Sequence, residues 1–198
     1  MYWEQESILI LSDMHFGKIT HFRKNGIAVP TDIMKEDIQR LFDVIQFFKP
    51  KKVIIVGDLF HSIANNEHEL FKRWRNDFLH IEFILVKGNH DIIVEDWYIK
   101  ANITLVATCL QIQNFFFVHQ QEDFKNVVEE NHFLFCGHVH PAIVLKGMGR
   151  QSLKLPCYYF SNNKLLLPAF GKFTGNFIVE PKKQDTVYAI VNKDVIKL

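Results

Sequence analysis

The chain has 198 residues, of which 48% are apolar and 14% aromatic, so it can form a sizeable hydrophobic core and is not a disordered tail. Its 23 Lys and Arg residues nearly balance 22 Asp and Glu residues, and the net charge of +1 gives no general attraction to nucleic acids or membranes. Three widely spaced cysteines without a CxxC pair argue against a disulfide framework and against a thiolate zinc site.

The N-terminal stretch MYWEQESILILSD contains early acidic residues and an apolar run that is too short for a signal peptide. No apolar stretch approaches the roughly 18 residues that would span a bilayer. We therefore expect a cytoplasmic protein with no membrane association, consisting of a single domain over residues 1–198.

The first half of the chain alternates short apolar runs with amphipathic segments. The runs SILILS, KKVIIV and IEFILV predict strands that are buried on both faces. Residues 29–50 predict a helix that Thr31 or Asp32 could cap, and residues 65–80 predict a second helix. Apolar spacing places Leu70, Trp74 and Phe78 on the buried face of this second helix. The alternation indicates an α/β fold with parallel central strands.

After residue 100 the pattern changes to short apolar runs separated by turn residues, which predicts strands completing a mixed sheet. One helix is expected at residues 121–130, and a hairpin should turn at residues 192–194. The expected strands lie within residues 103–108, 110–120, 133–141, 142–147, 152–160, 164–170, 177–180 and 187–198.

Five of the predicted strands are followed directly by residues that commonly bind metal ions. The carboxyl ends of strands in an open α/β sheet border the crevice in which ligands bind, so we expect these side chains to converge. The motifs are DMH, GD, GNHD, VH and GHVH, and their candidate ligands are Asp13, His15, Asp58, Asn89, His119, His138 and His140.

This set of nitrogen and oxygen ligands without thiolate suits Mn²⁺, Fe or Zn²⁺ better than Ca²⁺. Seven ligands are too many for one tetrahedral site, but they suffice for two ions roughly 3.5–4 Å apart that share a carboxylate. Such a site would attract phosphate and acidify the water between the ions. Each motif alone has a structural explanation, such as a turn at Asp58 or a core position for His119, and it is the ordered set of five that favours a metal site.

The ordered motifs resemble those of the calcineurin-like metallophosphoesterases. This resemblance implies a four-layer αββα sandwich with mixed central sheets and two divalent metal ions, Mn²⁺ before Fe or Zn²⁺, at the sheet edge. It also implies how the ligands are divided: one ion is held by Asp13, His15 and His140, the other by Asn89, His119 and His138, and both by the bridging Asp58.

Longer stretches look like the ligase-associated DNA-damage-response endonuclease family, PdeM. They are DMHFGKITHFRKNGIAVP, GDLFHS, GHVHPAIVLKGMGRQSLKLPCYYF and LLLPAFGKFTGN, none of which metal binding alone requires. The resemblance implies a phosphodiesterase or endonuclease that acts on DNA in repair, in functional association with a DNA ligase and a helicase.

The predicted reaction is phosphodiester hydrolysis, in which a hydroxide that bridges both ions attacks phosphorus in line. Within GNHD, Gly88 should turn the chain sharply out of its strand, and Asn89 should add a neutral metal ligand. His90 should stabilise or protonate the leaving oxygen. Asp91 should fix the tautomer of His90 and raise its pKa, although it could also cap a helix within IIVEDWYIK.

Further polar residues near these motifs are candidates for contact with substrate phosphates, namely Lys18, His21, Arg23 and His61. A solvent-exposed basic loop explains the first three equally well. On the second predicted helix, Lys72, Arg73 and Arg75 are expected to lie on a solvated outer face.

Three functions therefore remain open. The first is a metal-dependent DNA-repair nuclease. The second is a hydrolase of small substrates, such as cyclic nucleotides or nucleotide-sugar and lipid pyrophosphates. The third is a non-catalytic scaffold, which the presence of a full ligand set disfavours.

Overall fold

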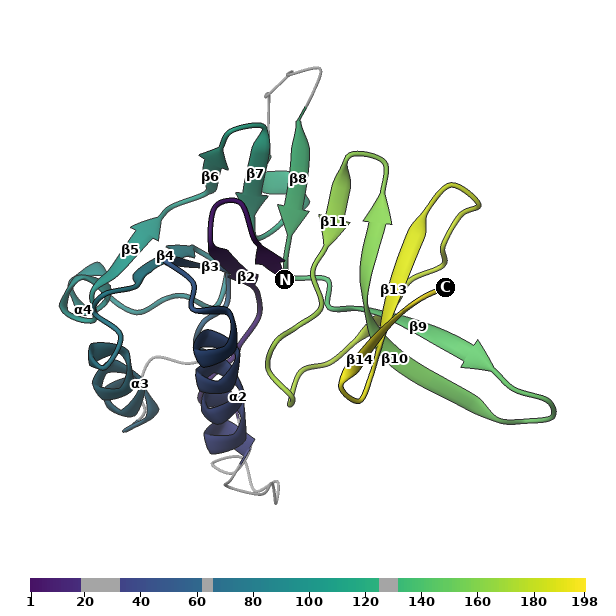
Figure 1. Cartoon of the computed structure of the whole chain (residues 1–198), viewed down its shortest axis with the longest axis horizontal. Coiled ribbons are helices and arrows are strands. Elements are labelled where there is room, and N and C mark those ends of the chain that lie inside the picture. Colours follow the sequence, from purple (N-terminus) through teal and green to yellow (C-terminus); the bar gives the residue numbers. More distant parts are fainter. Residues whose placement is uncertain (19–32, 62–65, 125–131) are drawn as a thin grey trace.

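The computed structural model describes residues 1–18, 33–61, 66–124 and 132–198 (Figure 1). Two β-sheets pack against each other, and helices cover the outer face of the first sheet. The α/β class and the mixed character of the sheets are therefore as predicted. None of the helices in the described ranges is long and apolar enough to cross a membrane.

The first sheet has the strand order β1-β2-β3-β4-β5. Four of its strands are parallel, and β1 adds an antiparallel edge beside β2. The three predicted apolar runs form β2, β3 and β4, whose side chains are almost all buried because both faces of the sheet are covered. The strands are β1 (Tyr2–Trp3), β2 (Ile8–Leu11), β3 (Lys52–Val56), β4 (Glu82–Val86) and β5 (Ile103–Val106).

Three helices pack on one face of this sheet: α2 (Ile33–Phe48), α3 (Asn66–Asn76) and α4 (Glu95–Lys100). Leu41 and Phe71 contribute to their shared core. The prediction that Leu70 faces the core is wrong, because Leu70 is exposed and the larger ring of Phe71 is buried in its place. The candidate caps Thr31 and Asp32 lie outside the described residues.

Arg75 also differs from its predicted solvated position, since its side chain is buried. The guanidinium group donates hydrogen bonds to the carbonyl oxygens of Phe78, Ile81 and Asn102, at 2.6, 2.8 and 3.0 Å. It also lies over the Phe83 ring. Arg75 therefore joins the loop between α3 and β4 to the loop before β5, and its hydrogen bonds offset the cost of burying its charge.

The second sheet is mixed and contains the remaining nine strands. The predicted terminal hairpin is confirmed, because Val191 pairs with Asp194 across the turn. Strands β7, β8 and β11 run parallel to one another. The nine strands are β6 (Cys109–Ile112), β7 (Phe115–Val118), β8 (Phe133–Cys136), β9 (Pro141–Lys146), β10 (Ser152–Ser161), β11 (Lys164–Leu166), β12 (Phe177–Ile178), β13 (Thr186–Val191) and β14 (Asp194–Lys197).

The two sheets share a core to which Ile10 and Ile54 contribute from the first sheet, and Phe117 and Phe135 from the second. The expected fourth, helical layer would cover the opposite face of the second sheet. The helix predicted for it at residues 121–130 lies mostly outside the described residues, and its described part contains a 3-10 turn at Gln121–Asp123. The described residues thus form three layers, with one layer of helices and two sheets.

Candidate metal centre

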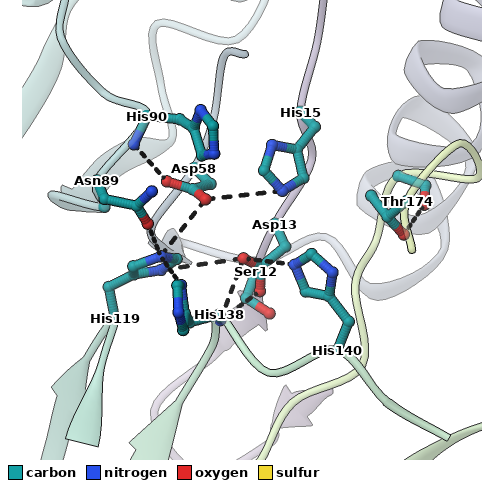
Figure 2. A network of polar contacts seen from close by, with 12 residues as sticks. Ser12, Asp13, His15, Asp58, Asn89, His90, His119, His138, His140 and Thr174 are labelled. Atoms are coloured by element: carbon teal, nitrogen blue, oxygen red, sulfur yellow. Dashed lines mark hydrogen bonds and ion pairs between the residues drawn. The ribbon is translucent and has the colours of Figure 1, made fainter. Parts of the chain in front are cut away.

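The residues that follow strands β2, β3, β4, β7 and β8 meet at one place in the structure (Figure 2). The convergence predicted from the strand ends is therefore present. All seven candidate ligands take part: Asp13, His15, Asp58, Asn89, His119, His138 and His140.

One group of potential ligand atoms comes from Asp13, His15 and His140, and these atoms lie within 4.8 Å of one another. The Asp13 carboxylate is fully buried, and its Oδ1 lies 3.1 Å from Nε2 of His140. The backbone N–H of His138 donates to the same carboxylate, to Oδ2 at 3.0 Å. Asp13 is thus fixed in place while one of its oxygens faces a histidine nitrogen.

A second group consists of Asp58, His119 and His138, again with ligand atoms within 4.8 Å. Nε2 of His119 is close to Nδ1 of His138, at 3.3 Å, and to Oδ1 of Asn89, at 3.0 Å. Two ring nitrogens and an amide oxygen therefore point to a common region. This is the set that the family resemblance implied for the second ion, with Asp58 beside it.

Asp58 lies between the two groups. Its Oδ2 is 3.6 Å from Nε2 of His15 in the first group and 3.4 Å from Nε2 of His119 in the second. Its other oxygen accepts the backbone N–H of His90 at 2.9 Å. A single buried carboxylate that faces both groups has the geometry that two neighbouring cations with a shared ligand require.

Backbone carbonyl groups orient two of the histidine rings. Nδ1 of His119 lies 3.2 Å from the carbonyl oxygen of Val56, and Nδ1 of His140 lies 3.0 Å from that of Gly175. A carbonyl oxygen only accepts hydrogen bonds, so each Nδ1 carries the hydrogen in the neutral ring. The Nε2 lone pair of both rings then faces the centre, which is the usual arrangement around protein-bound metal ions.

Several ring nitrogens at the centre are buried and have no hydrogen-bond partner among the described residues. They are Nδ1 and Nε2 of His15 and Nε2 of His140. Burying polar atoms without a partner is costly. A cation shared with Asp13 and Asp58 would satisfy Nε2 atoms of this kind, so the residues present fit a metal ion.

The backbone at the centre is strained in a consistent way. Positive φ angles, which are uncommon outside glycine, occur at five candidate ligands. They are Asp13 at 53°, His15 at 48°, Asp58 at 53°, His138 at 66° and His140 at 51°. Such conformations cost of the order of 1 kcal/mol each and cluster at functional sites, where the surrounding fold enforces them.

Two glycines allow the strand ends to approach the candidate ligands. Gly57 has a φ of 81°, and a Cβ atom there would overlap the His119 ring. At Gly88 a Cβ atom would overlap the Asp58 carboxylate. The turn expected at Gly88 is present, since its carbonyl accepts the N–H of Asp91 at 3.2 Å, and the missing side chain also admits the Asp58 carboxylate.

Asp91 has a different role from the one predicted. Its carboxylate accepts backbone N–H groups of Asp58, Gly88 and Leu59, at 2.8, 2.9 and 3.0 Å, and does not bind the His90 ring. It does not cap α4 either, since Val94 occupies the N-cap position. Burial raises the pKa of Asp91 to about 6, against the effect of its backbone hydrogen bonds. Asp91 therefore joins the loops after β3 and β4.

His90 lies beside the first group, with its ring centroid 5.3 Å from that of His15. The ring of His61 stacks on it at 4.7 Å, so the structure places His61 beside His90. Ring nitrogens of His15, His61 and His90 form a third set of potential ligands within 4.8 Å of one another. Sequence patterns did not predict this cluster, because GDLFHS only suggested that His61 lines the site.

Of the other predicted substrate contacts, Lys18 is half-buried and lines a small pocket with His15. Burial lowers the pKa of Lys18, while attraction to Asp58 and Asp13 opposes this shift. His21 and Arg23 lie outside the described residues.

Burial and neighbouring charges shift the pKa values of the candidate ligands in opposite directions. Burial lowers the pKa of His15 to about 3, although Asp58 attracts its charged form. For His119, burial also lowers the pKa, but the hydrogen bond and the charge of Asp58 outweigh this effect and raise it to about 9. For Asp58, burial alone would raise the pKa, whereas its interactions with His119 lower it to about 2.

One loop at the centre was not predicted from residue patterns. Residues 167–176 lead from β11 towards the first sheet, where the backbone N–H groups of Phe170 and Gly171 donate to the carbonyl groups of Ser12 and Asp13. The loop also supplies the Gly175 carbonyl that orients His140. A backbone carbonyl leaves no mark in the sequence, and the only signal was the family-like stretch LLLPAFGKFTGN.

Comparisons with known proteins agree with this geometry. Residues 6–142 match the family model for the calcineurin-like phosphoesterases. A solved structure of the Pseudomonas putida nuclease MPE is similar with a TM-score of 0.80 and 28% identity, over 100% of this chain and 90% of that chain. No curated protein matches the chain significantly.

Two further solved structures are more distant. The E. coli phosphoesterase Yfce has a TM-score of 0.49 and 14% identity, covering 93% of this chain and 88% of its own. A phosphodiesterase of archaeal origin has a TM-score of 0.46 and 16% identity, covering 96% of this chain and 98% of its own.

Proposed function

The chain belongs to the calcineurin-like phosphoesterases, a family of metal-dependent hydrolases, and we propose that it is a phosphodiesterase with two metal ions that cleaves DNA. The observation that carries this proposal is the position of Asp58 between two groups of ligands. The choice of DNA rests on the similarity to a bacterial nuclease along the whole chain.

In this proposal, Asp13, His15 and His140 hold one ion, Asn89, His119 and His138 hold the other, and Asp58 binds both. Mn²⁺ is the proposed metal, since it accepts a mixture of carboxylate, amide and imidazole ligands. Two such ions would lower the pKa of a water molecule and neutralise charge on the phosphoryl oxygens. The four-layer αββα arrangement is proposed as well, on the support of the two stacked sheets and the helices over the first.

The chain's own residues position the reacting groups. The carbonyl groups of Val56 and Gly175 hold the rings of His119 and His140 so that Nε2 faces the centre. We assign His90 to the leaving oxygen, because its ring is near His15 and its backbone is tied to Asp58. A proton delivered from the His90 ring would stabilise the departing alkoxide.

Lys18 and His61 each lie near His15, and in this proposal they contact phosphates next to the bond that breaks. A cytoplasmic role in DNA repair, alongside a ligase and a helicase, completes the proposal. Its support is the likeness of the flanking stretches to the ligase-associated endonucleases.

The proposal is tested with Asp58→Asn and a matched control, Asp77→Asn, which changes an exposed carboxylate after α3. We expect Asp58→Asn to lose bound metal and Mn²⁺-dependent DNA cleavage together, while Asp77→Asn retains both. Metal content by mass spectrometry and cleavage of defined single- and double-stranded DNA provide the two measurements. Unchanged turnover by Asp58→Asn would refute the assignment.

A panel of small phosphodiesters decides between this proposal and its alternative. Cleavage of cyclic nucleotides or of nucleotide-sugar pyrophosphates with a higher kcat/KM than DNA would identify a small-substrate hydrolase that uses the same centre. Metal binding without any hydrolysis would leave only the scaffold function.

A further inference from the structure

The nearly neutral overall charge conceals an uneven distribution along the chain. No Asp or Glu occurs between His132 and Val179, so all 22 acidic residues lie elsewhere. Five of the 23 basic residues lie within this stretch: Lys146, Arg150, Lys154, Lys164 and Lys172. The stretch also contains His138 and His140, so one side of the candidate metal centre is built from a segment without negative side chains.

Within this segment, residues 141–156 form a hairpin that we call the arm. It comprises β9, a turn at 147–151 and the first half of β10, and it projects away from the two packed sheets (Figure 1). Its first strand begins immediately after His140, so the arm starts at the centre itself. Met148 at its tip is 99% exposed.

The arm has two chemically different faces. Lys146 pairs across the strands with Ser152, and Lys154 pairs with Val144, so both lysines lie on the same face. The opposite face carries the pair Leu145 and Leu153. Apolar and basic side chains are therefore segregated along the hairpin, with Arg150 in the turn.

The basic face continues the face of β10 whose side chains pack towards the first sheet. Lys154 has the same parity along β10 as Tyr158 and Phe160, which pack into the core between the two sheets. Lys146, Arg150 and Lys154 are exposed, and none of their side chains has a hydrogen bond or ion pair with the described residues. Their charges remain available to an external anion.

We infer that the basic face of the arm binds the sugar-phosphate backbone of DNA, several nucleotides away from the phosphate at the metal centre. This inference rests on the proposed function and extends it, because a small phosphodiester could occupy the centre without reaching the arm. Three exposed cations on a hairpin whose own residues include no carboxylate suit a polyanion, whereas a small substrate would gain nothing from them.

The test replaces the three cations together, as Lys146→Gln, Arg150→Gln and Lys154→Gln, in the full-length Mn²⁺ enzyme. A control enzyme with Lys49→Gln, Arg73→Gln and Lys183→Gln loses the same charge at exposed positions outside the arm. Each enzyme is assayed on a long DNA substrate and on bis(p-nitrophenyl) phosphate, over a range of KCl concentrations.

For the arm variant we expect kcat/KM on DNA to fall by about tenfold or more near 0.1 M salt. In a plot of log kcat/KM on DNA against log KCl concentration, the slope should become shallower by roughly 0.7–0.9 for each DNA phosphate that the variant no longer binds. Hydrolysis of the small diester should stay at the wild-type level, as should both activities of the control enzyme. Exchanging the residues for other cations, as Lys146→Arg, Arg150→Lys and Lys154→Arg, should preserve DNA cleavage.

Equal DNA cleavage by the arm variant and the wild type would overturn the inference, as would a parallel loss on both substrates. Failure of the wild type to hydrolyse either substrate would instead refute the proposed function. A shift in affinity for an acidic protein with unchanged DNA cleavage would reassign the arm to a protein partner and would also overturn the inference.

Discussion

The Asp91 carboxylate lies 2.8 Å from the backbone nitrogen of Asp58, and one buried side chain thereby joins two loops that carry candidate metal ligands. Its oxygens accept further N–H groups from Leu59 and Gly88. The position of Asp58, the proposed shared ligand, therefore depends on a residue that does not face the centre.

Replacing Asp91 by alanine should leave several buried N–H groups without an acceptor. Each costs about 1–3 kcal/mol, so we expect the free energy of unfolding of the metal-free protein to fall by about 3 kcal/mol or more. Asp91→Asn keeps one acceptor oxygen, so its free energy of unfolding should fall by less than that of Asp91→Ala. Urea unfolding gives the stabilities, and titration with Mn²⁺ should show weaker binding in the same order.

The alternative role of Asp91, as a partner of the His90 ring, predicts a different outcome. In that case Asp91→Asn would alter the pH dependence of kcat and leave the stability of the metal-free protein unchanged. A wild-type urea midpoint for both Asp91 variants would contradict the role that the hydrogen bonds assign.

Gly57 provides a second test of how closely the centre is packed. In Gly57→Ala the new methyl group would overlap the His119 ring, and alanine is strained at a φ of 81°. Displacement of His119 should remove a ligand, so we expect loss of at least one bound ion and at least a hundredfold loss of activity, in line with the cost of misplacing catalytic groups by about 1 Å.

Gly149→Ala is the matched control for this variant. Gly149 has a φ of 90°, but no atom of the described residues lies within 4 Å of the position that a Cβ would take. Only the backbone strain of about 1–2 kcal/mol should then remain. If Gly149→Ala lost metal as Gly57→Ala does, strain in a left-handed conformation would explain both results, and contact with His119 would not.

The pKa of His119 predicts how metal binding depends on pH. The hydrogen bond and the charge of Asp58 outweigh the effect of burial and raise this pKa to about 9, so His119 is protonated at neutral pH in the metal-free protein. A metal ion must displace that proton, and its affinity should rise by about tenfold for each pH unit up to pH 9. Isothermal titration with Mn²⁺ at pH 7 and pH 8 measures the difference, together with the released proton.

The raised pKa of His119 has the opposite effect on the stability of the metal-free protein, which should fall as the pH rises. A histidine whose pKa is raised above its unfolded value of 6.5 contributes stability that is fully present below pH 6.5 and is lost as the pH rises towards 9. The increase in Tm on adding Mn²⁺ should therefore grow between pH 6.5 and pH 9. A constant increase over this window would contradict a protonated His119, and His119→Ala, which has no proton to displace, should show no such trend.

Much of this fold follows from local sequence patterns. Ile8–Leu11, Lys52–Val56 and Glu82–Val86 are short apolar runs between amphipathic helices, and this arrangement leaves few alternatives to parallel buried strands. The candidate ligands were predictable because each directly follows such a strand, and the ends of parallel strands meet at one edge.

Other features depend on tertiary contacts that the sequence does not encode locally. Apolar residues on α3 are spaced so that either Leu70 or Phe71 could face the core. The choice depends on how the helix is rotated about its axis, which only its tertiary contacts determine. The role of Asp91 depends on which N–H groups the β3 loop brings near it, and the neighbouring His90 was a misleading guide. The Gly175 carbonyl has no side chain by which it could have been found.

His90 offers a prediction that concerns the chemical step alone. If its ring protonates the leaving oxygen, His90→Ala should reduce kcat on DNA by about 10²–10⁴-fold, the usual contribution of a general acid. The leaving group of bis(p-nitrophenyl) phosphate is already stable as an anion, so the same variant should lose less than about tenfold on that substrate. His80→Ala, at an exposed position outside the centre, should match the wild type on both substrates. An equal loss of kcat on DNA and on the small diester would show that His90 acts on another step, and its contacts with His15 and His61 would then make a role in positioning the centre the better explanation.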